Sequence, residues 1–370
     1  MKITKLSLVN FRNYLNSSIS FGDHLNILVG DNAQGKTNIL EAIIILALTK
    51  SHRIGTSPNL IMFGKTKSKI NGVVKKDKIL SKLEIELADD YKKLKVNQTE
   101  IRKVADYISY LNIIVFTPDD LEIVKGSPNV RRNLLNVQLS QISKEYLNYY
   151  NEYNKLLKTR NEYLKILFNN SIADTNYLDI ITEKLIEKAV FIYQKRNDYI
   201  NLVNLSINSF YKDISGEDGI TIQYLPNIEL DNYDSETIRK KLKHTFKKNY
   251  MKELNYGMTI YGPHRDDFIF EYHGHDLKYY GSQGQQKLAI ISFKLSEISI
   301  FKEFAGTEPV LLLDDIFGEL DIKKRNHLLK IIDSRDIQSI ITTTDLKSIQ
   351  KKYLENAYVF QVKNGNVERK

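Results

Sequence analysis

A chain of 370 residues with 42% hydrophobic residues is long enough for two or three domains, and it has no run of about 18 apolar residues, which argues against a membrane span. Cysteine is absent, which excludes disulfides and cysteine-ligated metals, and the strand-like start 1–6 does not resemble a signal peptide, so a cytoplasmic location is the default expectation. The formal charge of +9 permits nucleic-acid binding, but an AT-rich genome explains the abundance of lysine equally well.

The first predicted elements lead into a phosphate-binding loop. Residues 2–9, 18–21 and 25–29 are predicted strands of one small sheet, and a helix is predicted over 38–48. Between the last strand and this helix stands Gly-Asp-Asn-Ala-Gln-Gly-Lys-Thr, the G-x-x-x-x-G-K-[ST] spacing known as Walker A. The residues predicted to hold ATP here are Gly30, Asp31, Asn32, Ala33, Gln34, Gly35, Lys36 and Thr37.

The positions that the Walker A spacing fixes each have a chemical role. The glycines let backbone N–H groups approach the phosphates, and the start of the following helix adds a positive dipole end. We expect Lys36 to reach the β- and γ-phosphates as a catalytic residue, and the Thr37 hydroxyl to ligate Mg²⁺.

The middle of the chain changes from strands to helices. Antiparallel strands are predicted at 68–74, 81–87 and 92–96, followed by a buried strand at 113–116. A heptad seam then predicts one long helix over 139–167, and a second helix is predicted over about 177–213. The pair is either an antiparallel arm inserted into the ATPase or an ordinary helical subdomain, and its tyrosine stripe is interpreted as core.

Two sets of basic residues in this region have open interpretations. The helix predicted over 235–255 is rich in lysine, which usually means a solvated face, with DNA contact as the alternative. Arg131 and Arg132 are expected at an interface or on DNA. Arg12 and Arg53 are expected to contact either the nucleotide or a salt-bridge partner.

The second half of the predicted site follows a buried strand at 308–313. That strand ends in Asp314 and Asp315, the Walker B pattern, in which Asp314 would hold Mg²⁺ and Asp315 would polarise the attacking water. Residues 317–321 stand at the place of the D-loop of ABC-type ATPases. A further buried strand at 340–343 leads to Thr344, the expected γ-phosphate sensor.

Between these two halves lies an element typical of ABC-type ATPases. Ser282, Gln283, Gly284 and Gln285 stand at the opening of a helix predicted over 288–300, so a hydroxyl, a glycine N–H and a helix dipole would bind a γ-phosphate. In ABC-type ATPases this phosphate belongs to ATP on the Walker A loop of a second subunit. The order of motifs therefore predicts an ATP-dependent head-to-tail homodimer.

The motifs together resemble the RecF family of bacterial recombination mediator ATPases. The interval of 248 positions between Lys36 and Gly284 exceeds that of transporter subunits and falls short of the coiled-coil insertions of SMC-type proteins. The resemblance is carried by the segments 10–14, 50–53, 118–121, 124–132, 262–267 and 282–286. Leu134 and Gly318 depart from the family pattern, which affects local packing and the D-loop rather than the ATP site.

The resemblance implies a fold class and a function. It implies an α/β fold with an ABC-type ATPase head (a P-loop, RecA-like core plus an antiparallel β subdomain) over 1–116 and 257–370, and an inserted α-helical arm over 117–256. It further implies a weak, DNA-stimulated ATPase of DNA repair and replication that uses ATP and Mg²⁺. Such a protein would dimerise on single-stranded, gapped or double-stranded DNA and act with RecR and RecO in recombinase loading and the SOS response.

Two other classes of function compete with this expectation. The first is the energising subunit of an ABC transporter, which the helical insertion and the Ser-Gln-Gly-Gln-Gln element oppose. The second is a structural clamp with a degenerate ATP site, which intact Lys36, Thr37 and Asp314 oppose.

Overall fold

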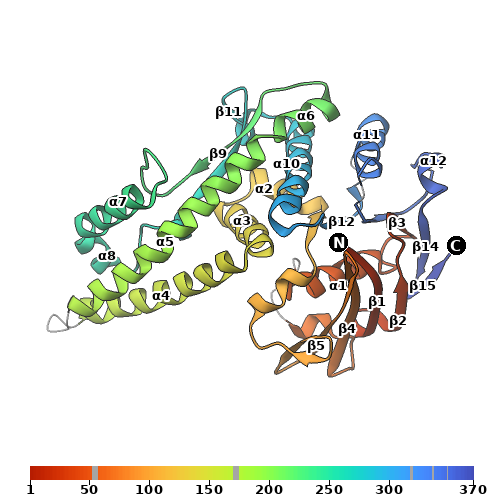
Figure 1. The fold of residues 1–370 in the computed structure, drawn as a ribbon, viewed down its shortest axis with the longest axis horizontal. Coiled ribbons are helices and arrows are strands. Elements are labelled where there is room, and N and C mark those ends of the chain that lie inside the picture. Colours follow the sequence, from red (N-terminus) through yellow and green to blue (C-terminus); the bar gives the residue numbers. More distant parts are fainter. Residues whose placement is uncertain (52–56, 170–174, 317–319, 336, 348) are drawn as a thin grey trace. The chain divides into compact units, whose positions relative to one another are not determined.

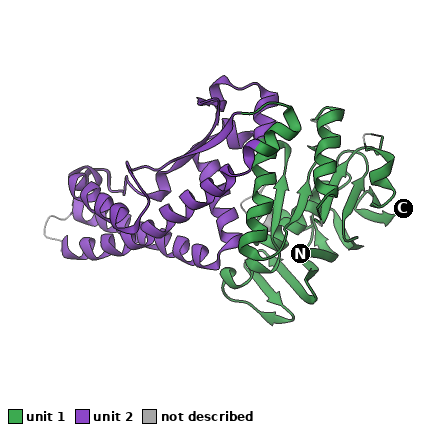
Figure 2. Cartoon of the chain, turned by 45° about the horizontal axis from the view of Figure 1, so that its top comes forward, with its two compact units in different colours: residues 1–120, 209–218, 290–370 green, residues 121–208, 219–289 purple. Residues whose placement is uncertain are grey.

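The structure is a computed structural model that describes residues 1–51, 57–169, 175–316, 320–335, 337–347 and 349–370 (Figure 1). The chain packs as two compact units (Figure 2). Unit 1 comprises residues 1–120, 209–218 and 290–370, and unit 2 comprises residues 121–208 and 219–289. The predicted domain boundaries at 116/117 and 256/257 stay a prediction; residues 257–289 pack within unit 2.

Unit 1 contains an antiparallel sheet in the order β2-β1-β4-β5-β6-β7. Its strands are β1 (Lys2–Phe11), β2 (Tyr14–Ser20), β4 (Lys67–Lys76), β5 (Ile79–Ala88), β6 (Lys92–Val96) and β7 (Thr99–Glu100). Apolar and polar residues alternate along its strands, so one face is buried and the other faces solvent. On β1, Leu6 and Leu8 are buried while Lys5 is exposed. The three strands predicted within 68–96 are confirmed, each close to its predicted bounds.

A second sheet of unit 1 is parallel except at one edge, in the order β15-β14-β3-β13-β12-β8. Its strands are β3 (Leu25–Val29), β8 (Ile113–Phe116), β12 (Val310–Leu313), β13 (Ser339–Thr343), β14 (Tyr358–Lys363) and β15 (Asn366–Arg369). The prediction of one sheet over residues 1–30 is wrong, because β3 pairs with β13 and β14 and not with β1 or β2. Strand pairing between distant segments is invisible to local alternation.

The helix α1 (Lys36–Leu48) contributes to one core shared with both sheets. It packs against β4, β5 and β13, and its residues 39–47 are buried all round, as expected of a helix without a polar face. The remaining helices of unit 1 are α11 (Ile322–Asp333) and α12 (Lys351–Leu354). Two helices cross the boundary between the units, α6 (Ile207–Ser215) and α10 (Gln283–Ala305).

Unit 2 is mainly helical, with one small sheet in the order β11-β10-β9. Its helices are α2 (Leu121–Lys125), α3 (Pro128–Ile142), α4 (Lys144–Asn169), α5 (Thr175–Asn204), α7 (Ser235–Lys248), α8 (Tyr250–Tyr256) and α9 (Leu277–Tyr280). Its strands are β9 (Ile220–Leu225), β10 (Asp267–Tyr272) and β11 (His275–Asp276).

Both long helices differ from their predicted bounds. The seam predicted over 139–167 is divided at Ser143, whose extended backbone separates α3 from α4, and the helix predicted to reach 213 ends at Asn204. The Ser143 hydroxyl accepts a hydrogen bond from the Tyr146 N–H at 3.0 Å, so it caps α4. A heptad pattern does not reveal such a break because the apolar spacing continues through it.

The helices α4 and α5 form an antiparallel pair, which Figure 1 shows side by side. Glu152 on α4 pairs with Lys188 on α5 at 3.0 Å, and the rings of Tyr163 on α4 and Tyr177 on α5 are 4.7 Å apart. Residue numbers on α5 therefore fall as those on α4 rise, as expected of antiparallel helices. Tyr146 and Tyr153 are almost completely buried, which confirms that this part of the tyrosine stripe is core. The buried Arg160 pairs with Glu253 at 2.7 Å, which satisfies the one cation in the seam.

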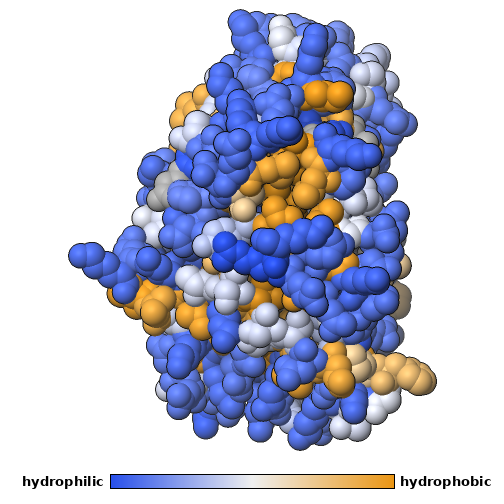
Figure 3. All heavy atoms as spheres, turned by 90° about the vertical axis from the view of Figure 1, so that its right-hand side faces the viewer, coloured by the Kyte–Doolittle hydropathy of each residue, from blue (hydrophilic) through white to orange (hydrophobic). Residues whose placement is uncertain are grey.

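The surface is largely hydrophilic, as the face in Figure 3 shows, with smaller apolar areas between the polar side chains. Among the helices in the described part of the chain, none combines the length and the apolar character that crossing a membrane requires.

Candidate nucleotide-binding site

The Walker A loop lies between β3 and α1, as predicted, and its glycines are required by close packing. Gly35 has φ +114°, and a Cβ there would lie 2.7 Å from the Tyr14 hydroxyl, which donates a hydrogen bond to the Gly35 carbonyl at 3.0 Å. A Cβ at Gly30 would meet the Val362 carbonyl at 2.3 Å. Any side chain at either position would displace the loop.

The turn between β1 and β2 braces this loop from the side. The Asn13 side chain donates to the Gln34 carbonyl at 3.2 Å and accepts from Asn38 at 2.9 Å. Arg12 donates two hydrogen bonds of 2.9 Å to the buried Glu41 carboxylate on α1. Of the two interpretations of Arg12, the structure shows the ion pair.

Lys36 and Thr37 begin α1 and point into the site. The Lys36 ammonium donates to the Gly30 and Asp31 carbonyls at 2.7 and 2.8 Å. Burial lowers the pKa of Lys36, and the nearby Asp315 and Asp314 carboxylates oppose that shift. The Thr37 hydroxyl donates to Asp314 Oδ1 at 3.0 Å, so the two predicted Mg²⁺ ligands are adjacent.

A residue that sequence reasoning missed, Thr342, contacts the Asp314 carboxylate and the backbone of Asp315. Its hydroxyl donates to Asp314 Oδ1 at 2.8 Å and accepts the Asp315 N–H, also at 2.8 Å. The register explains this contact, because β13 lies between β3 and β12 and pairs Ile341 with Leu313. A signal for Thr342 was present in the sequence, because three threonines stand in a row at the end of the predicted 340–343 strand. The last of them, Thr344, is the one predicted to act at the site.

These groups line one cavity of about 220 Å³ within unit 1. It is bounded by Walker A residues, by both Walker B carboxylates and by Thr342. Asp315 is exposed and has φ +48°, a left-handed backbone that aspartate and asparagine tolerate better than most residues. Thr344 is exposed just beyond β13 and is not among the residues that line this cavity, so its sensor role stays a prediction. Within the predicted D-loop, residues 317–319 lie outside the described residues, as do His52 and Arg53.

Ser282 and Gln285 form a reciprocal cap at the start of α10 in unit 2. The Gln285 side chain accepts the Ser282 N–H at 2.9 Å, and the Ser282 hydroxyl accepts the Gln285 N–H at 3.2 Å. This is the capping box of an S-x-x-Q sequence, which fixes the helix start. The helix also begins earlier than the predicted Leu288.

Gly284 has no structural reason to be glycine. It is exposed in the first turn of α10, and a Cβ there would meet only the Ser282 hydroxyl, at 3.9 Å. Glycine in a helix costs about 1 kcal/mol relative to alanine. A residue that weakens its own helix without a packing reason is consistent with close approach of another molecule to this face.

Two motifs of the family resemblance have structural roles in unit 2. Arg131 is buried and forms a bidentate pair with Asp267 at 2.6 and 2.8 Å, so the expectation of a DNA or partner contact is wrong for this arginine. Arg196 pairs with the buried Asp266 at 2.9 Å. The two aspartates of the 265–267 triplet are therefore partners of buried arginines.

His264 belongs to the same buried network. Its Nε2 lies 3.1 Å from the Thr259 carbonyl, which can only accept, and its Nδ1 lies 2.6 Å from the Tyr153 hydroxyl. Nε2 therefore carries a proton, and in the neutral ring Nδ1 accepts from the Tyr153 hydroxyl. Burial lowers the pKa of His264 to about 4.

The buried neutral histidine predicts a pH dependence of stability. Between pH 6.5 and 4 the unfolded chain binds a proton at this ring that the folded chain does not, so stability falls as pH falls. We expect His264→Gln to reduce the loss of unfolding free energy between pH 7 and pH 5 by about 2 kcal/mol, measured by denaturant titration at both values. His244→Gln, at an exposed position on α7, is the control and should leave the loss unchanged. Equal pH dependence in the His264 variant and the wild type would contradict the assignment.

The site fits a nucleotide with Mg²⁺. The described residues hold no group of three or more His, Cys, Asp or Glu side chains that could bind a metal without help. Thr37 and Asp314 instead supply two neighbouring hard oxygen ligands, and Mg²⁺ usually takes few protein ligands and completes its shell with phosphates and water.

Comparison with known proteins agrees with these features. The family model described as RecF/RecN/SMC N terminal domain matches residues 2–368. Two relatives called DNA replication and repair protein RecF are similar to this chain. The one from Oceanobacillus iheyensis is 39% identical over 99% of the chain and 100% of its own length. The one from Enterococcus faecalis is 40% identical over 100% of the chain and 99% of its own length.

Solved structures show the same fold. A structure of the recombination mediator protein RecF-ATP in the RecFOR pathway has a TM-score of 0.91 at 33% identity, covering 100% of this chain and 97% of that one. A structure titled RecF-ATPrS has the same TM-score at 32% identity, covering 100% and 98%. An SMC head is similar in fold alone, with a TM-score of 0.57 at 15% identity, covering 100% and 97%. The predicted ABC-type α/β fold class is confirmed.

Proposed function

This chain belongs to the RecF family, within the wider RecF/RecN/SMC N-terminal domain family, and from that premise we propose that it is an ATP-dependent DNA-binding protein of replication and recombinational repair. Relatives of matching length are called DNA replication and repair proteins, and similar structures are described with ATP. ATP binding by this chain is supported by a complete Walker A loop and two Walker B carboxylates around one cavity.

The mechanism rests on two groups of residues, in different parts of the chain, that each suit a bound phosphate. The described residues that line the cavity come from the Walker A loop, from Asn38 just after it on α1, from the two Walker B aspartates and from Thr342 on β13. The exposed Ser282 hydroxyl and the unexplained Gly284 form the other group, at the start of α10. We infer that this second group acts on ATP held by another copy of the chain, so that ATP joins two chains head to tail.

Each residue of the composite site then has a role. Lys36 and the loop amides bind the phosphates, while Thr37 and Asp314 would hold Mg²⁺, which neutralises phosphate charge when bound. Asp315 accepts a proton from the water that attacks the γ-phosphorus, and the bond to the β-phosphate oxygen breaks to leave ADP and phosphate. Ser282 through Gln285 would contact the γ-phosphate in trans, and Thr344 would sense it.

Hydrolysis would set how long the dimer stays on DNA and would not drive mechanical work. Aspartate is one methylene shorter than the glutamate that fast ABC-type ATPases use at the position of Asp315, so water is held less well. We therefore expect slow turnover that DNA stimulates. On this proposal ATP keeps the dimer on DNA and hydrolysis releases it.

The proposed partners follow from the relatives. Similar structures are described within the RecFOR pathway, which supports RecR and RecO as partners of this chain. We further propose that it acts in recombinase loading at single-strand gaps and in the SOS response. A cytoplasmic location follows as a prediction from the same role.

Sedimentation velocity with gapped DNA tests the proposal. We expect a monomer without nucleotide, a dimer with ATP, and ATP turnover that rises when gapped DNA is added. A chain that stays monomeric with ATP would contradict the mechanism. Turnover as fast as that of transporter subunits and indifferent to DNA would instead favour the transporter class.

A further inference from the structure

The solvated face of the antiparallel sheet in unit 1 carries an excess of lysine. Strand alternation places on this face the outward positions of β1, β4, β5 and β6, whose intervening residues are buried. Its cations are Lys5, Lys67, Lys69, Lys75, Lys82, Lys93 and Lys95, and its anions on the same strands are Glu84 and Glu86. Glu100 on β7 lies opposite Lys95 on the same face, so lysines still outnumber acidic residues there.

The ion pairs on this face neutralise only part of that charge. Lys95 pairs with Glu84 at 2.8 Å, and Lys69 pairs with Glu86 at 3.0 Å. Lys5 and Lys82 are exposed and form no ion pair with any residue that the structure describes. The register Lys5–Val73–Lys82 puts these two lysines two strands apart, with Cα atoms about 10 Å from each other.

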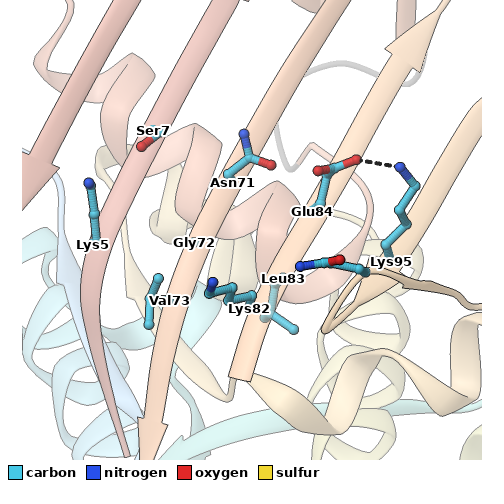
Figure 4. Close-up of a pocket in the computed structure, with 10 residues that line it drawn as sticks. Lys5, Ser7, Asn71, Gly72, Val73, Lys82, Leu83, Glu84 and Lys95 are labelled. Carbon is cyan, nitrogen blue, oxygen red and sulfur yellow. Dashed lines mark hydrogen bonds and ion pairs between the residues drawn. The ribbon is translucent and has the colours of Figure 1, made fainter. Parts of the chain in front are cut away.

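The two lysines border a hollow of about 280 Å³ in this face (Figure 4). Its floor carries small polar side chains, Ser7 from β1 and Asn71 from β4, which are cross-strand neighbours. Figure 4 shows Val73 between Lys5 and Lys82, and the Glu84–Lys95 pair continuing the row of Ser7 and Asn71. The hollow thus combines two unneutralised cations with neutral hydrogen-bond donors.

We propose that this sheet face binds the sugar-phosphate backbone of duplex DNA, with Lys5 and Lys82 as its principal phosphate contacts. Lysine, serine and asparagine are the side chains that commonly contact phosphate oxygens, and none of them needs to read a base. An apolar protein partner is disfavoured because the outward side chains at the hollow are almost all polar or charged. The inference rests on the proposed DNA-binding function and adds a location to it.

The test compares two double variants that remove the same charge. Lys5→Gln/Lys82→Gln alters the sheet face, and Lys247→Gln/Lys248→Gln alters an equally exposed lysine pair on α7. Affinity for a fluorescent duplex is measured by anisotropy with ATP present, over a series of salt concentrations. Binding of a fluorescent ATP analogue checks that each variant is folded.

We expect the sheet variant to bind duplex about tenfold more weakly and to lower the slope of log affinity against log salt by about 2, since each phosphate contact contributes about 0.9. The α7 variant should change affinity less than about twofold. An unchanged slope in the sheet variant, with full ATP binding, would overturn this inference while leaving the proposed function intact. Failure of the wild-type chain to bind DNA with ATP would instead overturn the proposed function.

Discussion

Neither Lys36→Met nor Ser282→Arg alone is expected to dimerise with ATP, whereas an equimolar mixture of the two is expected to form a dimer. The methionine removes the one cation that contacts the loop carbonyls Gly30 and Asp31, so its chain should lose most of its ATP affinity. The arginine removes the capping hydroxyl and fills the open space beside Gly284, so its chain cannot approach a partner's phosphate. In the mixture, one Walker A loop and one Ser282 element remain intact and can meet across the two chains.

The readout is sedimentation velocity of each variant and of the mixture, with ATP and gapped DNA. Ser235→Arg is the matched control, because it places the same side chain at another exposed serine of unit 2 and should dimerise like the wild type. If the Ser282→Arg protein dimerised alone, the α10 start would not be part of the composite site. If the mixture stayed monomeric, the arrangement in trans would lose its support.

Asp315→Asn is expected to slow ATP hydrolysis by about 100-fold or more, the usual worth of a general base, while dimer formation with ATP persists. Asparagine keeps the size of the side chain and tolerates the left-handed φ of +48° at this position, so the backbone should not change. The amide cannot accept the proton of the attacking water. The dimer should consequently remain on DNA much longer than the wild-type dimer.

Single-turnover hydrolysis and the dissociation rate of the DNA-bound dimer measure the two halves of this prediction. Thr342→Val is the comparison, since it keeps both carboxylates and removes the hydroxyl that bonds Asp314 and the Asp315 N–H. It leaves that N–H without its partner and costs about 1–3 kcal/mol of stability, with a smaller loss of rate. Hydrolysis at the wild-type rate in Asp315→Asn would show that another group activates the water.

Local sequence patterns predicted the parts of this protein whose structure depends on neighbours in the chain. The strand–loop–helix around residues 25–48 and the helix start near Ser282 follow from strand runs, glycine positions and helix-start chemistry, all of which span a few residues. The long helices were predicted in kind but not in extent, because the turn at Ser143 preserves the apolar spacing on both sides.

The sequence by itself predicted the chemistry proposed for the site: a phosphate loop, a hydroxyl and a carboxylate suited to Mg²⁺, and a second helix start suited to an anion. The tertiary structure alone decided which distant residues complete that chemistry. Thr342 holds Asp314 and Asp315 because β13 lies beside β12, and Arg131 is a buried partner of Asp267 rather than a surface cation. Parallel strand order and the burial of a charge depend on contacts between segments far apart in the chain, and these leave no periodic signal in the sequence.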